Sequence, residues 1–94
     1  MVVGDIISGI FTTDNTYHYF QPAATTEIII TSCFATNNLR VGLYDGVTQS
    51  WSYATDNNLN NGTGMNLKIG INNTNYLLLY ADNSGPSYTG IQIK

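Results

Sequence analysis

Short runs in which apolar and polar residues alternate follow one another along this 94-residue chain. Leu39, Val41 and Leu43, for example, alternate with Arg40 and Gly42. A period of two places successive side chains on opposite faces of a β-strand, whereas an amphipathic helix needs a period near 3.6. No segment of the chain shows the helical period. The pattern therefore predicts an all-β fold.

The turn residues Gly, Asn, Asp and Pro divide the chain into about eight short candidate strands. These are residues 3–11, 16–20, 27–34, 39–44, 47–53, 65–71, 75–81 and 88–94. Asp45-Gly46 predicts a tight hairpin turn, and residues 56–64, rich in Asn and Gly, are predicted to form the longest loop. This spacing predicts a single small antiparallel domain over residues 1–94, either a β-sandwich or a jelly-roll-like fold.

The strand at residues 75–81 is apolar on both of its faces. One face carries Tyr76, Leu78 and Tyr80, and the other carries Leu77 and Leu79. Neither face suits water, so we predict that one meets the core and the other meets a neighbouring subunit.

Charged residues are scarce, at 10% of the chain, and the formal net charge is -3. The basic residues are Arg40, Lys68 and Lys94, too few to hold a nucleic-acid backbone. The amino terminus lacks the basic segment of a signal peptide, and no apolar run approaches the roughly 20 residues of a membrane helix. We therefore expect neither nucleic acid nor a membrane among the partners.

Few residues in this sequence could carry a reaction. His18 is the only histidine and Cys33 the only cysteine, so the chain has neither a two-histidine metal site nor an internal disulfide. Both lie in predicted strands, where a structural role is typical. We expect a non-enzymatic protein without cofactor or metal. A domain this small needs additional stabilisation, and oligomerisation is the means that remains.

Aromatic residues offer another possible site. Trp51 and Tyr53 are predicted to share a strand face, with Tyr44 across the hairpin turn. Such a platform could stack on sugar rings. The same residues could instead fill the core or form the centre of a subunit interface. The sequence leaves these three alternatives open.

Four segments of the chain resemble those of short structural proteins of tailed bacteriophages. They are GDIISGI at residues 4–10, FQPA at 20–23, INNTNYL at 71–77 and YTGIQIK at 88–94. The resemblance spans most of the chain and includes no catalytic signature. It implies a small all-β protein that is made in the cytoplasm of the bacterial host and added to the virion in many copies.

Within a virion, the resemblance implies one of two roles. A capsid decoration or cement protein binds the shell, commonly as a homotrimer, and stabilises contacts between major capsid subunits. A tail or fibre component would instead bind a receptor or carbohydrate. The lack of a repetitive shaft favours the decoration role. The residues expected to contact a partner are Val2, Val3, Ile6, Tyr76, Leu77, Leu79, Tyr80 and Tyr88.

Overall fold

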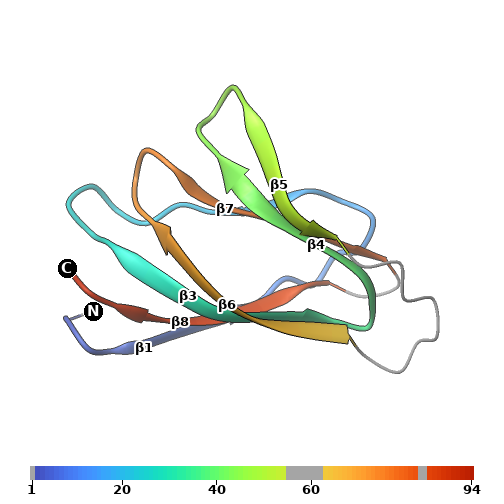
Figure 1. Cartoon of the computed structure of the whole chain (residues 1–94), viewed down its shortest axis with the longest axis horizontal. Coiled ribbons are helices and arrows are strands. Elements are labelled where there is room, and N and C mark those ends of the chain that lie inside the picture. The colour runs from blue at the N-terminus through green and yellow to red at the C-terminus, as the bar shows by residue number, and fades with distance from the viewer. Residues whose placement is uncertain (1, 55–62, 83–84) are drawn as a thin grey trace.

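The computed structural model describes residues 2–54, 63–82 and 85–94, and these form strands and turns. Two antiparallel sheets of four strands pack face to face (Figure 1). The strands are β1 (Ile6–Ile10), β2 (His18–Phe20), β3 (Ile28–Ala35), β4 (Asn37–Tyr44), β5 (Gln49–Ala54), β6 (Thr63–Ile71), β7 (Tyr76–Asp82) and β8 (Ser87–Gln92). The all-β prediction is therefore confirmed. Most of the predicted loop at residues 56–64 lies outside the described residues.

The strands follow the order of a jelly roll. One sheet runs β1-β8-β3-β6 and the other runs β2-β7-β4-β5. β1 pairs with β8, β2 with β7, β3 with β6 and β4 with β5, as if one long hairpin had been rolled into two sheets. Among the eight described strands, only β4 and β5 are neighbours both in the chain and in a sheet. The arrangement agrees with the predicted sandwich of jelly-roll type.

The core lies between the two sheets and is mainly aliphatic. Its buried members are Ile7, Ile28, Ile30, Cys33, Leu39, Val41, Ile71, Leu77 and Leu79. Burial raises the pKa of the Cys33 thiol to about 12, so Cys33 stays protonated and packs as a small apolar side chain. The sequence predicts that Leu77 and Leu79 contact a partner, but both are completely buried. For these two leucines the prediction is wrong, because their side of β7 faces the core.

The hairpin between β4 and β5 forms where Asp45-Gly46 predicts it. The Asp45 carboxylate oxygen Oδ1 accepts the backbone N–H groups of Val47 at 2.9 Å and Thr48 at 2.6 Å. Gly46 has a φ of 95°, which a residue with a side chain rarely adopts. The turn is therefore fixed by its own two residues.

β1 is shorter than the predicted strand at residues 3–11. Gly4 has a φ of 92°, and the Asp5 N–H donates to the Val2 carbonyl at 3.0 Å. The Gly4 N–H and the Asp5 carbonyl within this turn still bond to the backbone of Gln92. The ladder with β8 begins at Ile6, opposite Ile91.

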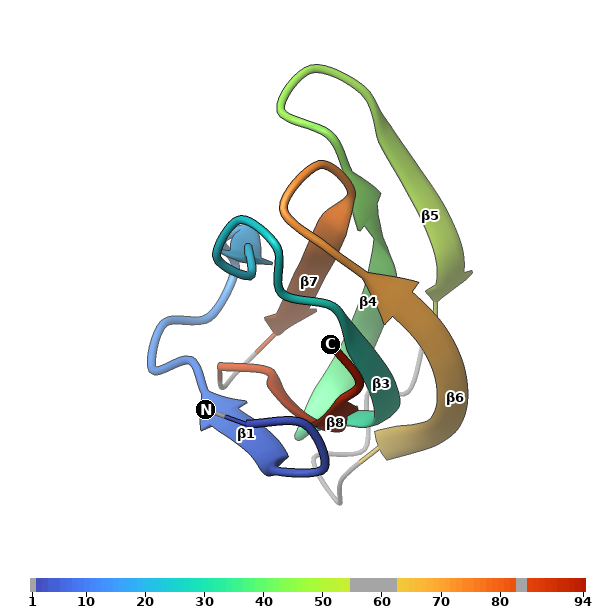
Figure 2. The same cartoon turned by 90° about the vertical axis from the view of Figure 1, so that its left-hand side faces the viewer.

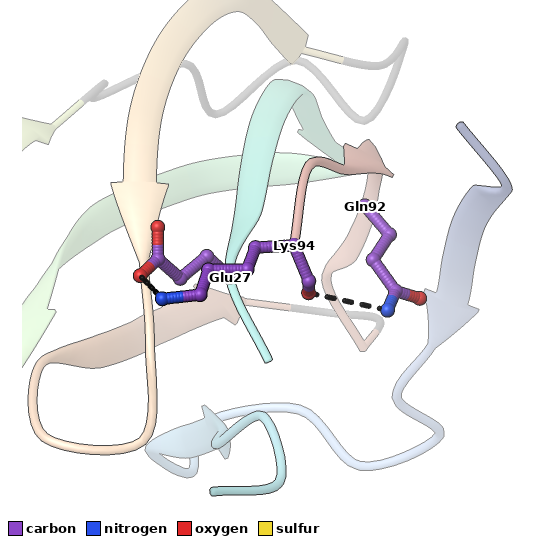
Figure 3. A network of polar contacts seen from close by, with 3 residues as sticks. All are labelled: Glu27, Gln92 and Lys94. Carbon is purple, nitrogen blue, oxygen red and sulfur yellow. Dashed lines mark hydrogen bonds and ion pairs between the residues drawn. The ribbon is translucent and has the colours of Figure 1, made fainter. Parts of the chain in front are cut away.

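The carboxyl-terminal residues are tied to the start of β3. The Glu27 N–H donates to the Lys94 carbonyl at 3.0 Å, and the Ile93 N–H donates to the Glu27 carbonyl at 2.9 Å. The Lys94 Nζ atom lies 3.8 Å from Glu27 Oε2, and the Gln92 Nε2 atom donates to the Lys94 carbonyl at 3.2 Å. Figure 3 draws both interactions. The ion pair is exposed and adds little stability, so the backbone bonds hold this end of the chain.

Candidate interaction surfaces

The outer face of the β2-β7-β4-β5 sheet carries an aromatic layer. Strand register places Tyr44 opposite Tyr76 and Tyr19 opposite Leu78. Four strands and their flanking residues thus contribute rings to one side of the sheet. We call this surface the aromatic face, and it consists of Tyr17, Tyr19, Tyr44, Trp51, Tyr76 and Tyr80.

The rings of the aromatic face contact one another. The Tyr17 ring centroid lies 5.7 Å from that of Trp51 and 5.5 Å from that of Tyr80. The Tyr19 and Tyr44 centroids lie 4.9 Å apart. Tilted and edge contacts at such distances are favourable for aromatic rings. The layer is therefore packed, although Tyr17 and Tyr19 remain 43% and 42% exposed.

Leu78 is buried beneath this layer. Leu77 and Leu79 lie in the core, so alternation along β7 directs Leu78 to the outer face, yet its exposure is 0%. Its neighbour on β4 is Gly42, where a Cβ atom would collide with the backbone of β5. The residue opposite Leu78 on β2 is Tyr19, and Tyr76 and Tyr80 flank it along β7, so the rings of the aromatic face are its neighbours on this side of the sheet.

Two members of the predicted platform of Tyr44, Trp51 and Tyr53 can be placed on the aromatic face. Tyr44 and Trp51 both belong to the aromatic face, but their rings contact different neighbours. The side chain of Tyr53 lies outside the described part of the structure.

Sequence reasoning missed Tyr17 and Tyr19 as members of this surface. The alternation in Tyr17-His18-Tyr19 was a usable signal, because two tyrosines at a spacing of two share a strand face. What the sequence could not supply is the neighbour of β2 in the sheet. That neighbour is β7, which lies more than 50 positions further along the chain.

Polar groups border the aromatic face at one end. The Arg40 Cζ atom lies 5.3 Å from the centroid of the Tyr80 ring, within the range of a cation–π contact. The Tyr80 hydroxyl donates to Asn15 Oδ1 at 3.3 Å. Partial burial, and then the nearby Asp82 carboxylate, raise the pKa of Tyr80, so the hydroxyl is protonated at neutral pH. This surface can therefore offer ring faces, neutral hydroxyls and one cation to a ligand.

His18 has a structural position at the edge of the sandwich. Its ring stacks on Phe11 with centroids 4.5 Å apart, and Nε2 lies 2.7 Å from the Thr13 carbonyl, to which it donates in the tautomer that carries a proton on Nε2. Throughout residues 2–54, 63–82 and 85–94, no three His, Cys, Asp or Glu side chains gather as a metal site requires. No helix in these ranges is long and apolar enough to cross a membrane.

The outer face of the other sheet carries two groups of apolar residues. Ile6, Ile91 and Ile29 lie abreast on β1, β8 and β3, and Ile6 is 77% exposed. Further along the same strands, Ile10 is 77% exposed and Phe34 is 46% exposed. A row of Ser and Thr residues separates the two groups. We call the surface formed by these five residues the apolar face.

β8 exposes an apolar residue and buries a polar one. Ile91 is 42% exposed, whereas Gln92 is only 6% exposed. The pairing of Ile28 with Gln92 and of Ile29 with Ile91 fixes this register. A shift by one residue would exchange the two faces. The sequence thus keeps isoleucine at a solvent-facing position where a polar residue would be expected.

Five of the residues expected to contact a partner are accessible. Val2 and Val3 are each 66% exposed and lie just before β1, next to the exposed Ile6. Tyr76 and Tyr80 are half-buried members of the aromatic face. These five residues therefore fall on two separate surfaces.

Tyr88, by contrast, lies on the inner side of β8. Its ring stacks on Phe20 with centroids 4.7 Å apart and packs against the core. A Cβ atom at Gly9 would lie 2.7 Å from the Tyr88 hydroxyl oxygen, so β1 leaves room for the ring. Tyr88 is half-buried, as Tyr76 and Tyr80 are, and its ring fills the edge of the sandwich, so its contact with a partner stays a prediction.

No protein-family model matches the chain, and no curated protein matches it.

Proposed function

We propose that this chain is a non-enzymatic structural protein of a bacteriophage virion and acts as a capsid decoration protein. In this proposal it assembles in the host cytoplasm and binds the major capsid protein or another virion protein. The bound copies stabilise contacts between capsid subunits.

One observation carries the proposal. Ten large hydrophobic side chains are exposed among the described residues, and most of them lie on or beside one sheet. The members of this group are Val2, Val3, Ile6, Ile10, Phe34, Ile91 and Ile93. Exposed apolar residues that gather on one surface are typical of protein–protein contact sites. The phage resemblance of the sequence supplies the class of partner.

The mechanism follows from the burial of this surface. Removing apolar surface from water contributes about 25 cal/mol per Å², from which the cost of ordering both partners is subtracted. A contact of this kind is weak in one copy. Repeated over a capsid lattice, it raises the barrier to the separation of subunits.

The test uses virions of the phage that encodes the chain. Mass spectrometry of purified particles should detect the protein in many copies, and particles from a deletion mutant should release DNA at a lower temperature. Ile91→Asp should abolish binding to deletion-mutant particles, whereas Val47→Asp, at an 88% exposed turn position, should bind as the wild type does. Absence of the protein from purified virions would refute the proposal.

The aromatic face favours a second candidate function, which is carbohydrate binding by a tail or fibre component. Half-exposed tyrosines beside Asn15 and Arg40 resemble the stacking platforms on which sugar rings lie. A glycan array tests this alternative. Binding that is lost in Tyr19→Ser, with an unchanged circular dichroism spectrum, would support it, whereas no binding by the wild type would exclude it for the glycans present.

A further inference from the structure

β1 lies at the edge of its sheet, with β8 as its one neighbour among the described strands (Figure 2). The Gln92 N–H donates to the Asp5 carbonyl, and the Phe11 N–H donates to the Pro86 carbonyl. Hydrogen-bonded pairs alternate along an antiparallel ladder, so the odd-numbered residues of β1 bond to β8. The N–H and C=O groups of Ile6, Ser8 and Ile10 therefore face the free edge.

This edge lacks the features that usually prevent strand pairing. Exposed edges are commonly protected by charged residues, proline, bulges or short length. The β1 segment has no charge and no proline, and its Ile6 and Ile10 side chains are both 77% exposed.

The other three edge strands differ from β1. β2 has only three residues, and β6 carries the exposed Lys68. β5 is interrupted by a register shift and presents the exposed polar residues Gln49 and Ser50. β1 is therefore the edge best suited to receive another strand.

We infer that β1 pairs with β1 of a second copy of this chain across a two-fold axis at Ser8. The outward residues of β1 are symmetric about Ser8, with isoleucine two positions before and two positions after it. An antiparallel pair centred there sets Ile6 opposite Ile10 of the second copy, and Ser8 opposite Ser8. Each opposed pair exchanges two N–H···O bonds, since all three residues direct their backbone groups to this edge.

The side chains of the two copies are compatible with this pairing. Ile6 and Ile10 stand on the same side of β1, so each isoleucine gains an apolar neighbour on the adjacent strand. The rows of the apolar face then continue from one copy into the next. No charged residue lies within Ile6–Ile10. The pairing of two copies therefore sets no like charges opposite each other.

The contact is small and has a defined symmetry. Five paired residues bury much less than the roughly 1,600 Å² of a standard interface, so we expect a reversible dimer. A two-fold contact closes as a dimer, whereas the resemblance of the sequence implies a trimer.

The inference does not depend on the proposed function, because it concerns the purified protein alone.

Cross-linking tests the register. The variant Ser8→Cys, treated with a short bismaleimide, should give a covalent dimer at least tenfold faster than Thr48→Cys, which places the thiol in the β4–β5 turn. In Figure 2 this turn lies at the opposite end of the molecule from β1. The native Cys33 is buried and its raised pKa keeps it unreactive.

Light scattering tests the dimer itself. The wild-type mass should rise from that of the 10.3 kDa monomer towards twice that value with concentration. Ser8→Pro removes the central outward N–H but none of the bonds to β8, so it should remain monomeric while its circular dichroism matches the wild type. If Ser8→Pro fails to fold, the cross-linking rate of Ser8→Cys and the mass of the wild type still test the dimer.

The inference stands only if the wild type forms dimers and Ser8→Cys cross-links faster than the control. A wild type that stays monomeric overturns it. A dimer or trimer in which Ser8→Cys links no faster than Thr48→Cys overturns it as well, because another surface then holds the copies together.

Discussion

At the scale of single residues, Leu78 shows that this small protein buries side chains on both sides of one sheet. It lies outside the core cluster, yet it is fully covered. The aromatic rings above it act as a partial third layer. An apolar side chain on the outer side of the sheet is thus covered by the chain itself.

We predict that Leu78→Ala lowers the free energy of unfolding by about 2–5 kcal/mol, the usual cost of truncating a buried leucine. Urea denaturation followed by Trp51 fluorescence measures the change. The matched control is Val47→Ala, an 88% exposed position where we expect a change within about 0.5 kcal/mol. Equal stability of the two variants would mean that the rings do not pack on Leu78.

Cys33 gives a prediction for alkaline pH. The thiol loses its proton near the ordinary pKa of 9.0 when unfolded but keeps it to about 12 when folded. Between these values the folded state holds more protons, so stability falls as pH rises. Urea denaturation below and above pH 9.0 should show a smaller loss for Cys33→Ala than for the wild type. Parallel pH profiles would contradict the assignment.

At the scale of elements, local patterns predicted the strands well and their orientation less well. Asp45-Gly46 specified its hairpin because a turn is decided by the residues within it. The orientation of β8 was not predictable, since Ile91 faces outward only through its register with β3. The pairing of β7 with β2 and β4 likewise decides which of its faces meets the core, and it turns Leu77, a predicted partner contact, inward.

The β4–β5 turn supplies a prediction at this scale. Gly46→Ala should reduce the free energy of unfolding by about 1 kcal/mol, because alanine is strained at a φ of 95°. Thermal or urea denaturation measures the loss. Gly70→Ala is the control, since a Cβ atom there meets no heavy atom within 4 Å. A loss at Gly70 as large as that at Gly46 would argue against turn strain as the cause.

At the scale of the whole molecule, the strand pairing joins the two ends of the chain. β1 pairs with β8 and β2 with β7, and each pair connects residues that are far apart in sequence. This non-local pairing also explains what the sequence could not predict about the candidate sites. The aromatic face unites Tyr17 with Trp51 and Tyr80, and the apolar face unites Ile6 with Ile91.

The same topology should make folding slow. Folding rates fall as contacts become less local, and two-state domains dominated by such pairings fold in milliseconds to seconds. Stopped-flow refolding, followed by Trp51 fluorescence, should therefore give a relaxation within that range. A relaxation in microseconds would contradict the pairing of distant strands, because among the described strand pairs only the β4–β5 hairpin is local enough to form at that rate.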